Sequence, residues 1–259
     1  MGYETVEFDV TNHIATITLN RPEVLNAFNQ RMLDEFSDIW RRIRIEDDVR
    51  VVVLQANGER AFCTGLDRVA GIDMPENPWS RLPPAFQLGP KSNHVFKPLI
   101  TAVHGMCAGG AFYWVSESDI VICSDDAEFF DPHTSYGMTS PFVPASLMRR
   151  VPWAEALRMA LLGLDERVTA KRAFEIGLVS EVVPASGLRA RAADLAAQIA
   201  AKPPSVIQGT VKAAWISITA PASVMLETGT NYSAIGNPLA VSEPKSSLSD
   251  KARTPPTRR

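Results

Sequence analysis

Short apolar runs, each ending in a turn, recur over the first 183 residues and predict strands. Residues 51–55 (VVVLQ) and 99–103 (LITAV) are almost continuously apolar, which is typical of strands covered on both faces rather than of a sheet with one face in water. The pattern therefore predicts an α/β core. The predicted strands are residues 6–10, 13–20, 49–58, 98–105, 119–124 and 178–183.

Segments whose apolar residues recur every three or four positions, as in helices, alternate with these strands and make up most of the second half of the chain. Within residues 26–45, the apolar side chains fall three and four positions apart, which predicts an amphipathic helix packed on the sheet. These side chains are Leu33, Phe36, Ile39, Trp40 and Ile43. Further helices are predicted at residues 153–163, 169–177, 187–200 and 205–218, the last one opened by Pro203 and Pro204.

These patterns divide the chain into three parts. We expect a core at residues 1–200 and a helical region at residues 201–236. Residues 237–259 are rich in proline, serine and charge without apolar periodicity, which predicts a disordered tail. Residues 71–98 contain six prolines and form a long irregular segment, which in a compact domain is usually functional.

Composition narrows the class of protein. The 259 residues are 46% hydrophobic and 21% charged, with a formal net charge of −3 and scattered basic residues, so a nucleic-acid partner is not expected. No signal sequence or lipidation signal begins the chain, and no apolar run approaches the roughly 20 residues of a membrane span. Three cysteines without CxxC spacing indicate neither a disulfide framework nor a zinc site. We therefore expect a cytoplasmic protein without a membrane partner.

Familiar catalytic motifs do not occur in the sequence. The dinucleotide fingerprint GxGxxG, the phosphate-binding P-loop and the serine-hydrolase motif GxSxG are all missing, and the four histidines show no metal-ligand spacing, so no metal is expected. Two similar bends remain, at residues 59–67 (ERAFCTGLD) and 106–114 (MCAGGAFYW). Unpaired N–H groups at such bends can converge on one oxygen and stabilise negative charge there. The alternative is two packing turns in which glycine permits close approach.

Four separated stretches, in order, resemble the crotonase (enoyl-CoA hydratase/isomerase) superfamily over roughly residues 5 to 235. They are LNRPEVLNAFN (19–29), ANGERAFCTGLD (56–67), KPLITAVHGMCAGGAFYWVSESDIVICSDDAEF (97–129) and RVTAKRAFEIGLVSEVVP (167–184). The resemblance implies a spiral of ββα turns and a C-terminal helical oligomerisation region that forms trimers or dimers of trimers. It also implies an acyl-CoA thioester as substrate and no separate cofactor.

Carried over by position, the resemblance assigns the oxyanion donors to the N–H groups of Leu66 and Gly110. Both would bond the thioester oxygen and favour an enolate. The residues that the resemblance implies for substrate and CoA binding are Val24, Leu25, Ala61, Leu66, Asp67, Arg68, Val69 and Gly110.

This chain departs from the family at both acid/base positions. A typical hydratase of the family carries two glutamates, and the matching positions here are Tyr113 and His133. An imidazole exchanges protons near neutrality, which makes His133 the candidate acid/base in place of glutamate. Alternatively, His133 caps a turn after Pro132. Asp131 could orient the ring, or it could be a solvated turn acid.

Other candidates have both a chemical and a structural interpretation. Tyr113 and Glu117 are four residues apart on one helix face, so the carboxylate could hold the phenol; alternatively Tyr113 only fills the space of the absent glutamate. Asp67 is expected to organise its turn, and His104 is expected to be structural.

The variable segment 71–98 carries Met74, Trp79, Phe86 and Phe96, which could wall a site for a bulky or aromatic acyl group, or merely anchor the loop. We predict an enoyl-CoA hydratase or isomerase, with a lyase of fatty-acid metabolism as the favoured class. One alternative is a hydrolase that cleaves carbon–carbon bonds in cyclic β-dicarbonyls. Relatives with that activity pair a histidine with an aspartate, and Phe142 stands at the aspartate's position. The other alternative is a non-catalytic acyl-CoA binding protein.

Overall fold

The computed structural model describes residues 2–80, 82–218 and 220–242. Its larger sheet contains the six strands predicted from the apolar runs, in the order β1-β2-β3-β5-β7-β10. β1 is antiparallel to β2, and the remaining neighbours are parallel. The strands are β1 (Val6–Thr11), β2 (Ile14–Leu19), β3 (Val51–Ala56), β5 (Leu99–Val103), β7 (Ile120–Ser124) and β10 (Glu181–Val183).

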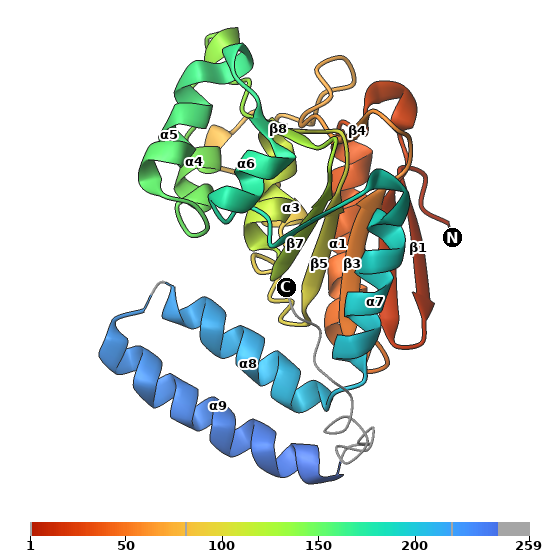
Figure 1. Cartoon of the computed structure of the whole chain (residues 1–259), viewed down its shortest axis with the longest axis vertical. Coiled ribbons are helices and arrows are strands. Elements are labelled where there is room, and N and C mark those ends of the chain that lie inside the picture. Colours follow the sequence, from red (N-terminus) through yellow and green to blue (C-terminus); the bar gives the residue numbers. More distant parts are fainter. Residues whose placement is uncertain (1, 81, 219, 243–259) are drawn as a thin grey trace.

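Helices cover both faces of this sheet (Figure 1). In β3, Val52 and Leu54 join the core that contains α1 (Gln30–Ile45), whereas Val51 and Val53 join the core that contains α7 (Leu188–Ala200). Successive side chains of a strand point to opposite faces, so a strand buried on both sides is apolar at every position. The predicted α/β core is therefore confirmed.

Strands of a second, smaller sheet follow directly after those of the first. This sheet has the order β4-β6-β8-β9. β3 leads into β4 (Ala61–Cys63), β5 into β6 (Met106–Ala108) and β7 into β8 (Glu128–Phe130), and a helix follows each pair. The expected spiral of strand–strand–helix turns is thus confirmed, and it stacks the bends after β4, β6 and β8 on one side of the molecule.

The helices of these turns and of the next segment are short. They are α2 (Pro84–Leu88), α3 (Phe112–Glu117), α4 (Phe142–Leu147), α5 (Trp153–Leu162) and α6 (Ala170–Glu175), with β9 (Val168–Thr169) between the last two. The one-turn helices that matter for the site are η3 (Gly109–Ala111) and η4 (Thr134–Tyr136).

Two long helices, α8 (Pro204–Ser217) and α9 (Ala222–Ser242), form a hairpin beside the body of the molecule (Figure 1). Residues 237–242 belong to α9, so the predicted disordered tail is wrong for these six residues, and the rest of that tail lies outside the described residues. None of the helices in the described ranges combines the length and hydrophobicity needed to cross a membrane.

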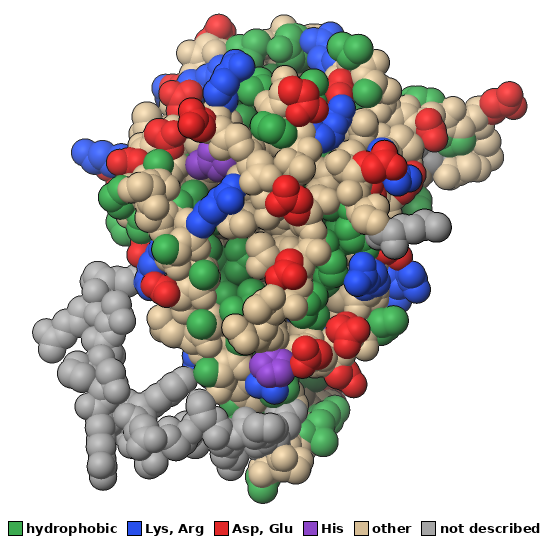
Figure 2. Space-filling model, turned by 90° about the vertical axis from the view of Figure 1, so that its right-hand side faces the viewer, with side chains coloured by type: hydrophobic (Ala, Val, Ile, Leu, Met, Phe, Trp, Pro, Cys, Tyr) green, Lys and Arg blue, Asp and Glu red, His purple; other side chains and the backbone are tan. Residues whose placement is uncertain are grey.

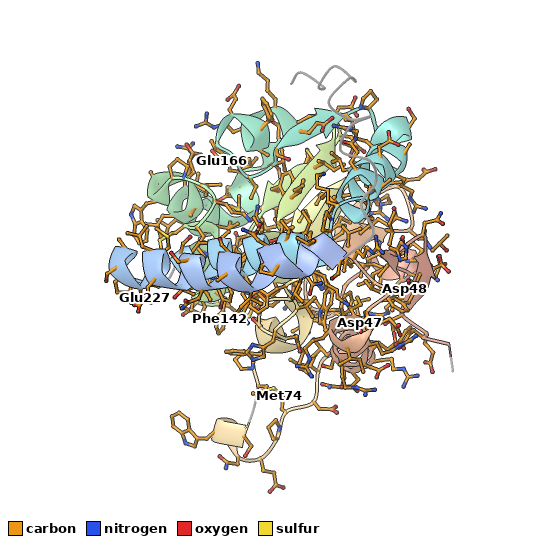
Figure 3. All side chains as sticks on the ribbon, turned by 90° about the horizontal axis from the view of Figure 1, so that it is seen from below. Asp47, Asp48, Met74, Phe142, Glu166 and Glu227 are labelled. Carbon is orange, nitrogen blue, oxygen red and sulfur yellow. The ribbon has the colours of Figure 1, made fainter. Side chains whose placement is uncertain are left out.

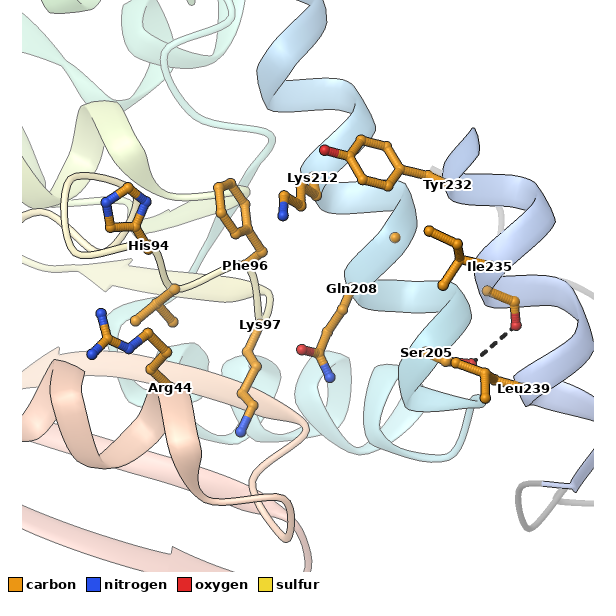
Figure 4. A pocket seen from close by; sticks show the side chains of 13 residues that line it. Arg44, His94, Phe96, Lys97, Ser205, Gln208, Lys212, Tyr232, Ile235 and Leu239 are labelled. Atoms are coloured by element: carbon orange, nitrogen blue, oxygen red, sulfur yellow. Dashed lines mark hydrogen bonds between the residues drawn. The ribbon is translucent and has the colours of Figure 1, made fainter. Parts of the chain in front are cut away.

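The hairpin meets the body across a groove of about 390 Å³ (Figure 4). Lys212 of α8 lies 5.3 Å from the ring centre of Phe96 there. A second contact is the hydrogen bond of 2.6 Å that Trp215 Nε1 donates to Asp119. Acidic and basic side chains are interspersed over the face of the molecule in Figure 2, without a stripe of one sign.

Candidate active site

A cavity of about 710 Å³ opens where the bends after β4, β6 and β8 come together. Six of the predicted site residues line it: Leu66, Asp67, Arg68, Gly110, Tyr113 and His133. The same cavity is lined by Phe28, Ile72, Pro84, Tyr136 and Phe142. The spiral therefore brings together positions that lie up to 114 residues apart in the chain.

The two glycine-bearing bends lie in direct contact. Gly65 has a φ of +89°, and a Cβ on it would lie 2.9 Å from the Gly110 nitrogen. A Cβ on Gly110 would lie 2.4 Å from Cε1 of the buried Phe28 ring. A side chain at either position would thus force apart the backbone segments, which explains why glycine is required at both.

The N–H groups of Leu66 and Gly110 both lie on this contact. Phe28 pairs with Leu66 in a parallel bridge, in which the Phe28 N–H donates to Gly65 O and the Asp67 N–H donates to Phe28 O, each over 2.8 Å. In such a bridge the N–H of the paired residue itself points away from its partner strand. The Gly110 N–H belongs to the first turn of η3, before any intrahelical bond forms.

His133 lies against Gly109, the residue before Gly110. A Cβ on Gly109 would lie 3.7 Å from His133 Cε1, so the imidazole is next to the second bend. The residue after the histidine anchors the loop, since Thr134 donates a hydrogen bond of 2.7 Å to the Ala160 carbonyl of α5. The imidazole is a quarter exposed and therefore open to the cavity.

Asp131 holds the imidazole from behind. Its carboxylate oxygen lies 2.5 Å from His133 Nδ1, and its other oxygen accepts a hydrogen bond from the Ser140 hydroxyl. Asp131 has no exposed surface, so the interpretation as a solvated turn acid is wrong and the interpretation as the orienting residue holds. The hydrogen bond to Asp131 raises the pKa of His133, and this effect is opposed by partial burial of the ring.

Tyr113 belongs to an aromatic wall beside Gly110. Its ring centre lies 6.3 Å from that of Phe28 and 6.3 Å from that of Phe142. The wall is therefore built from α3, α4 and the segment before α1.

The large apolar side chains of the segment 71–98 do not form this wall. Met74, Trp79 and Phe86 are exposed, and the part around Met74 extends away from the body (Figure 3). Phe96 lines the groove beside α8 instead.

Glu117 is bound elsewhere. Its carboxylate accepts hydrogen bonds from the backbone N–H groups of Lys91 (2.7 Å) and Ser92 (3.0 Å) and from the Ser92 hydroxyl (2.5 Å). Glu117 does not line the cavity that Tyr113 lines. The carboxylate thus fastens the loop before β5 to α3, and Glu117 has this structural role.

Asp67 organises its turn, as expected. One carboxylate oxygen accepts from the N–H groups of Val69 and Ala70, each over 3.0 Å, and the other accepts from Arg21 over 2.9 Å. These bonds and the Arg21 charge lower the pKa of Asp67. His104 lies outside the cavity lining, and burial lowers its pKa.

The residues expected to contact CoA divide into two groups. Leu25 and Ala61 line a separate hollow of about 190 Å³ beside Arg60, whereas Leu66, Asp67 and Arg68 line the main cavity. Val24 and Val69 are exposed at the surface.

Cys63, Cys107 and Cys123 are buried and form no disulfide bond. Within the described ranges, no group of three histidine, cysteine or acidic residues could hold a metal ion.

Sequence reasoning missed two residues of the site. Ser140, which donates to Asp131, follows no motif, and nine residues separate the two in the chain. Phe28 was quoted only as part of a matching stretch, although its bridge to Leu66 sets the first bend. A phenylalanine in a turn carries no chemical signal that would have singled it out.

Comparison with known proteins agrees with the fold. The family model for enoyl-CoA hydratase/isomerase matches residues 9–231. The (E)-benzylidenesuccinyl-CoA hydratase of Thauera aromatica is 34% identical, with 88% of this chain and 87% of the relative covered. A probable enoyl-CoA hydratase of Rhodobacter capsulatus is 34% identical, with 88% of each chain covered.

Solved structures give the same result. A crystal structure of an enoyl-CoA hydratase/isomerase from Mycobacterium paratuberculosis superposes with a TM-score of 0.82 at 35% identity, and the match covers 90% of each chain. The matched region of this chain contains both glycine-bearing bends and the His133 loop. The chain is therefore a member of the enoyl-CoA hydratase/isomerase (crotonase) family and an acyl-CoA enzyme.

Proposed function

We propose that this enzyme hydrates an enoyl-CoA through a thioester enolate, with His133 as the proton-transfer group. The thioester oxygen accepts hydrogen bonds from the N–H groups of Leu66 and Gly110. Two fixed donors at that oxygen stabilise the charge that develops during addition, and loss of one such donor costs about 3 kcal/mol of barrier. The contact between Gly65 and Gly110 supports this assignment, because it holds both donors at one end of the cavity.

The observation that carries the proposal is the bond of 2.5 Å between Asp131 and His133 Nδ1 at the wall of this cavity. With Nδ1 engaged, Nε2 is the nitrogen that exchanges protons. It accepts a proton from water as the water oxygen bonds to Cβ of the substrate, and the π electrons move to the thioester oxygen. The imidazolium then returns a proton to Cα, and the carbonyl re-forms.

The acyl group that we propose is bulky and aryl-bearing. Phe28, Tyr113 and Phe142 present an aromatic wall beside the oxyanion donors, and aromatic rings stack favourably on such walls. The relative from Thauera aromatica is named for a substrate with a benzylidene group, which supports the same size class. The reaction needs no cofactor beyond the CoA of the substrate.

A second candidate reaction uses the same pair of residues. In this chain Asp131 supplies the aspartate partner of the histidine, although Phe142 replaces the aspartate of the ring-cleaving relatives. An imidazole held in this way can also activate water for attack on a ketone, followed by cleavage of a carbon–carbon bond in a cyclic β-dicarbonyl. Addition of water without release of a new carboxylic acid end distinguishes hydration from this cleavage.

The test is a substrate panel read by mass spectrometry. We expect the enzyme to add 18 mass units to cinnamoyl-CoA more efficiently than to crotonyl-CoA, and to leave cyclic β-diketones unchanged. Cleavage of the diketones without hydration of either enoyl-CoA would establish the second candidate. If the protein bound the CoA esters but converted no compound of the panel, it would be a non-catalytic acyl-CoA binding protein, and the proposal would be contradicted.

We further propose a homotrimer or dimer of trimers in a reducing cytoplasm. The hairpin of α8 and α9 supports the assembly, since α9 exposes Leu226, Ile235, Leu239 and Val241 and carries a single charged residue, Glu227. The three unpaired cysteines support the compartment.

A further inference from the structure

Arg68 reaches from the first bend toward the loop of His133. Its guanidinium carbon lies 4.4 Å from the ring centre of Tyr136, which follows His133 by three residues and lines the same cavity. A guanidinium stacked on an aromatic face is held in place while its N–H edge stays available. The side chain is exposed, so it sits at the rim of the cavity rather than within the core.

Two acidic residues of the site, Asp67 beside Arg68 in the sequence and Asp131, are bound to other partners. Asp67 is bound to Arg21 and to its own turn, and Asp131 is buried behind His133. Within residues 2–80, 82–218 and 220–242, Arg68 forms no ion pair within 4.0 Å. The stacking on Tyr136 holds the guanidinium plane of Arg68 in one orientation. Two of its N–H groups can then donate in parallel to the two oxygens of a ligand carboxylate.

The position of Tyr136 decides which end of the ligand Arg68 faces. Tyr136 and His133 lie on the wall where the acyl group would react, whereas Leu25, Ala61 and Arg60 line the separate hollow at the first bend. Because its guanidinium lies over Tyr136, Arg68 points to the acyl end. The CoA phosphates are the other anions that an arginine here could meet.

We infer that Arg68 binds a carboxylate carried by the acyl group, so that the preferred substrates are CoA thioesters of dicarboxylic acids. The inference rests on the proposed function only in assuming that the acyl group occupies the cavity of His133. The carboxylate would sit on the guanidinium edge while the rest of the acyl group packs on the aromatic wall. Arg68 is thus a specificity-determining residue rather than a proton-transfer group.

The test compares two saturated esters that cannot be hydrated, succinyl-CoA and butyryl-CoA, by calorimetry. We expect the wild-type protein to bind succinyl-CoA about tenfold more tightly, because an arginine and a carboxylate form two parallel charge-assisted hydrogen bonds. Arg68→Met should abolish this preference while leaving the affinity for butyryl-CoA and free CoA within about twofold, and Arg68→Lys should restore only part of it.

Arg60→Met is the matched control, since Arg60 lines the other hollow and should leave the ratio of the two affinities unchanged. Equal losses for succinyl-CoA, butyryl-CoA and free CoA in Arg68→Met would assign the side chain to the CoA phosphates and overturn the inference. Equal affinities in the wild-type protein would overturn it as well. Neither ester has a double bond to hydrate, so these results are independent of whether His133 performs hydration.

Discussion

Asp131 and His133 lie two residues apart after β8, with a carboxylate oxygen 2.5 Å from Nδ1 of the ring. The Asp131 carboxylate is fully buried, whereas the His133 imidazole reaches the cavity, so only the histidine can contact a substrate. A negative charge at Nδ1 fixes the tautomer and favours the protonated ring. This relationship gives a single histidine the orientation and basicity that proton transfer requires.

Replacing Asp131 should therefore alter the pH dependence of the reaction. In Asp131→Asn the carboxylate that raises the pKa of His133 is gone, so the pKa should fall back toward its ordinary value of about 6.5. We expect the His133-dependent limb of the kcat profile to move to lower pH, with kcat reduced about tenfold or more. An unshifted profile in a folded variant would show that Asp131 does not tune the ring.

The same pair should make stability depend on pH. The folded-state pKa of His133 is raised above its unfolded value, so its contribution to the free energy of unfolding is complete below about pH 6.5 and is lost as the pH rises through the folded pKa. Wild-type protein and His133→Gln should differ most in urea unfolding at acidic pH and least at pH 9. A difference that grows with pH would contradict the raised pKa.

The two bends should not tolerate a methyl group. Gly65→Ala combines a φ of +89° with a Cβ 2.9 Å from the Gly110 nitrogen, so we expect a loss of stability of about 1–3 kcal/mol and a fall in kcat. Gly187→Ala is the matched control, because nothing lies within 4 Å of its Cβ and its φ is −100°. Thermal unfolding and initial rates check both predictions. If Gly65→Ala lost no more stability or kcat than Gly187→Ala, the close contact of the two bends would not matter for either.

Assembly should depend on the exposed side chains of α9. Ile235 is 61% exposed, and a charge there would be buried at a subunit contact, so Ile235→Glu should shift the expected trimer or hexamer toward monomer in light scattering. Val10→Glu is a control, since Val10 is also exposed but belongs to β1, the edge strand of the larger sheet, and not to the hairpin. A monomeric wild-type protein would contradict the assembly directly.

All six strands of the larger sheet were predictable from short runs rich in apolar and β-branched residues, and the signal was clearest for β3 and β5, which are buried at nearly every position. Strands β4, β6 and β8 of the smaller sheet have three residues each, too few for a periodic signal, and their neighbours in space define them. The helix expected from residue 26 begins at Gln30, because Leu25 and Asn26 have positive φ and Asn29 caps the helix by accepting from the Met32 N–H.

The site was predictable only in part, for similar reasons. The resemblance located the cavity-lining residues Leu66, Gly110 and His133, which local motifs identify. The role of Asp131 depends on its burial, which two neighbouring residues in a sequence do not reveal. An apolar wall was one of two interpretations of the segment 71–98, but the aromatic wall comes from Phe28, Tyr113 and Phe142, which only the spiral brings together.

The most direct test of His133 is the turnover of His133→Gln with the best enoyl-CoA of the panel, together with the affinity for its saturated analogue. Glutamine approximates the size of the imidazole but cannot exchange protons at neutral pH. We predict a kcat at least about 100-fold below wild type with the affinity for the thioester retained, since backbone N–H groups of Leu66 and Gly110 hold it. Wild-type turnover by the folded variant would contradict the account.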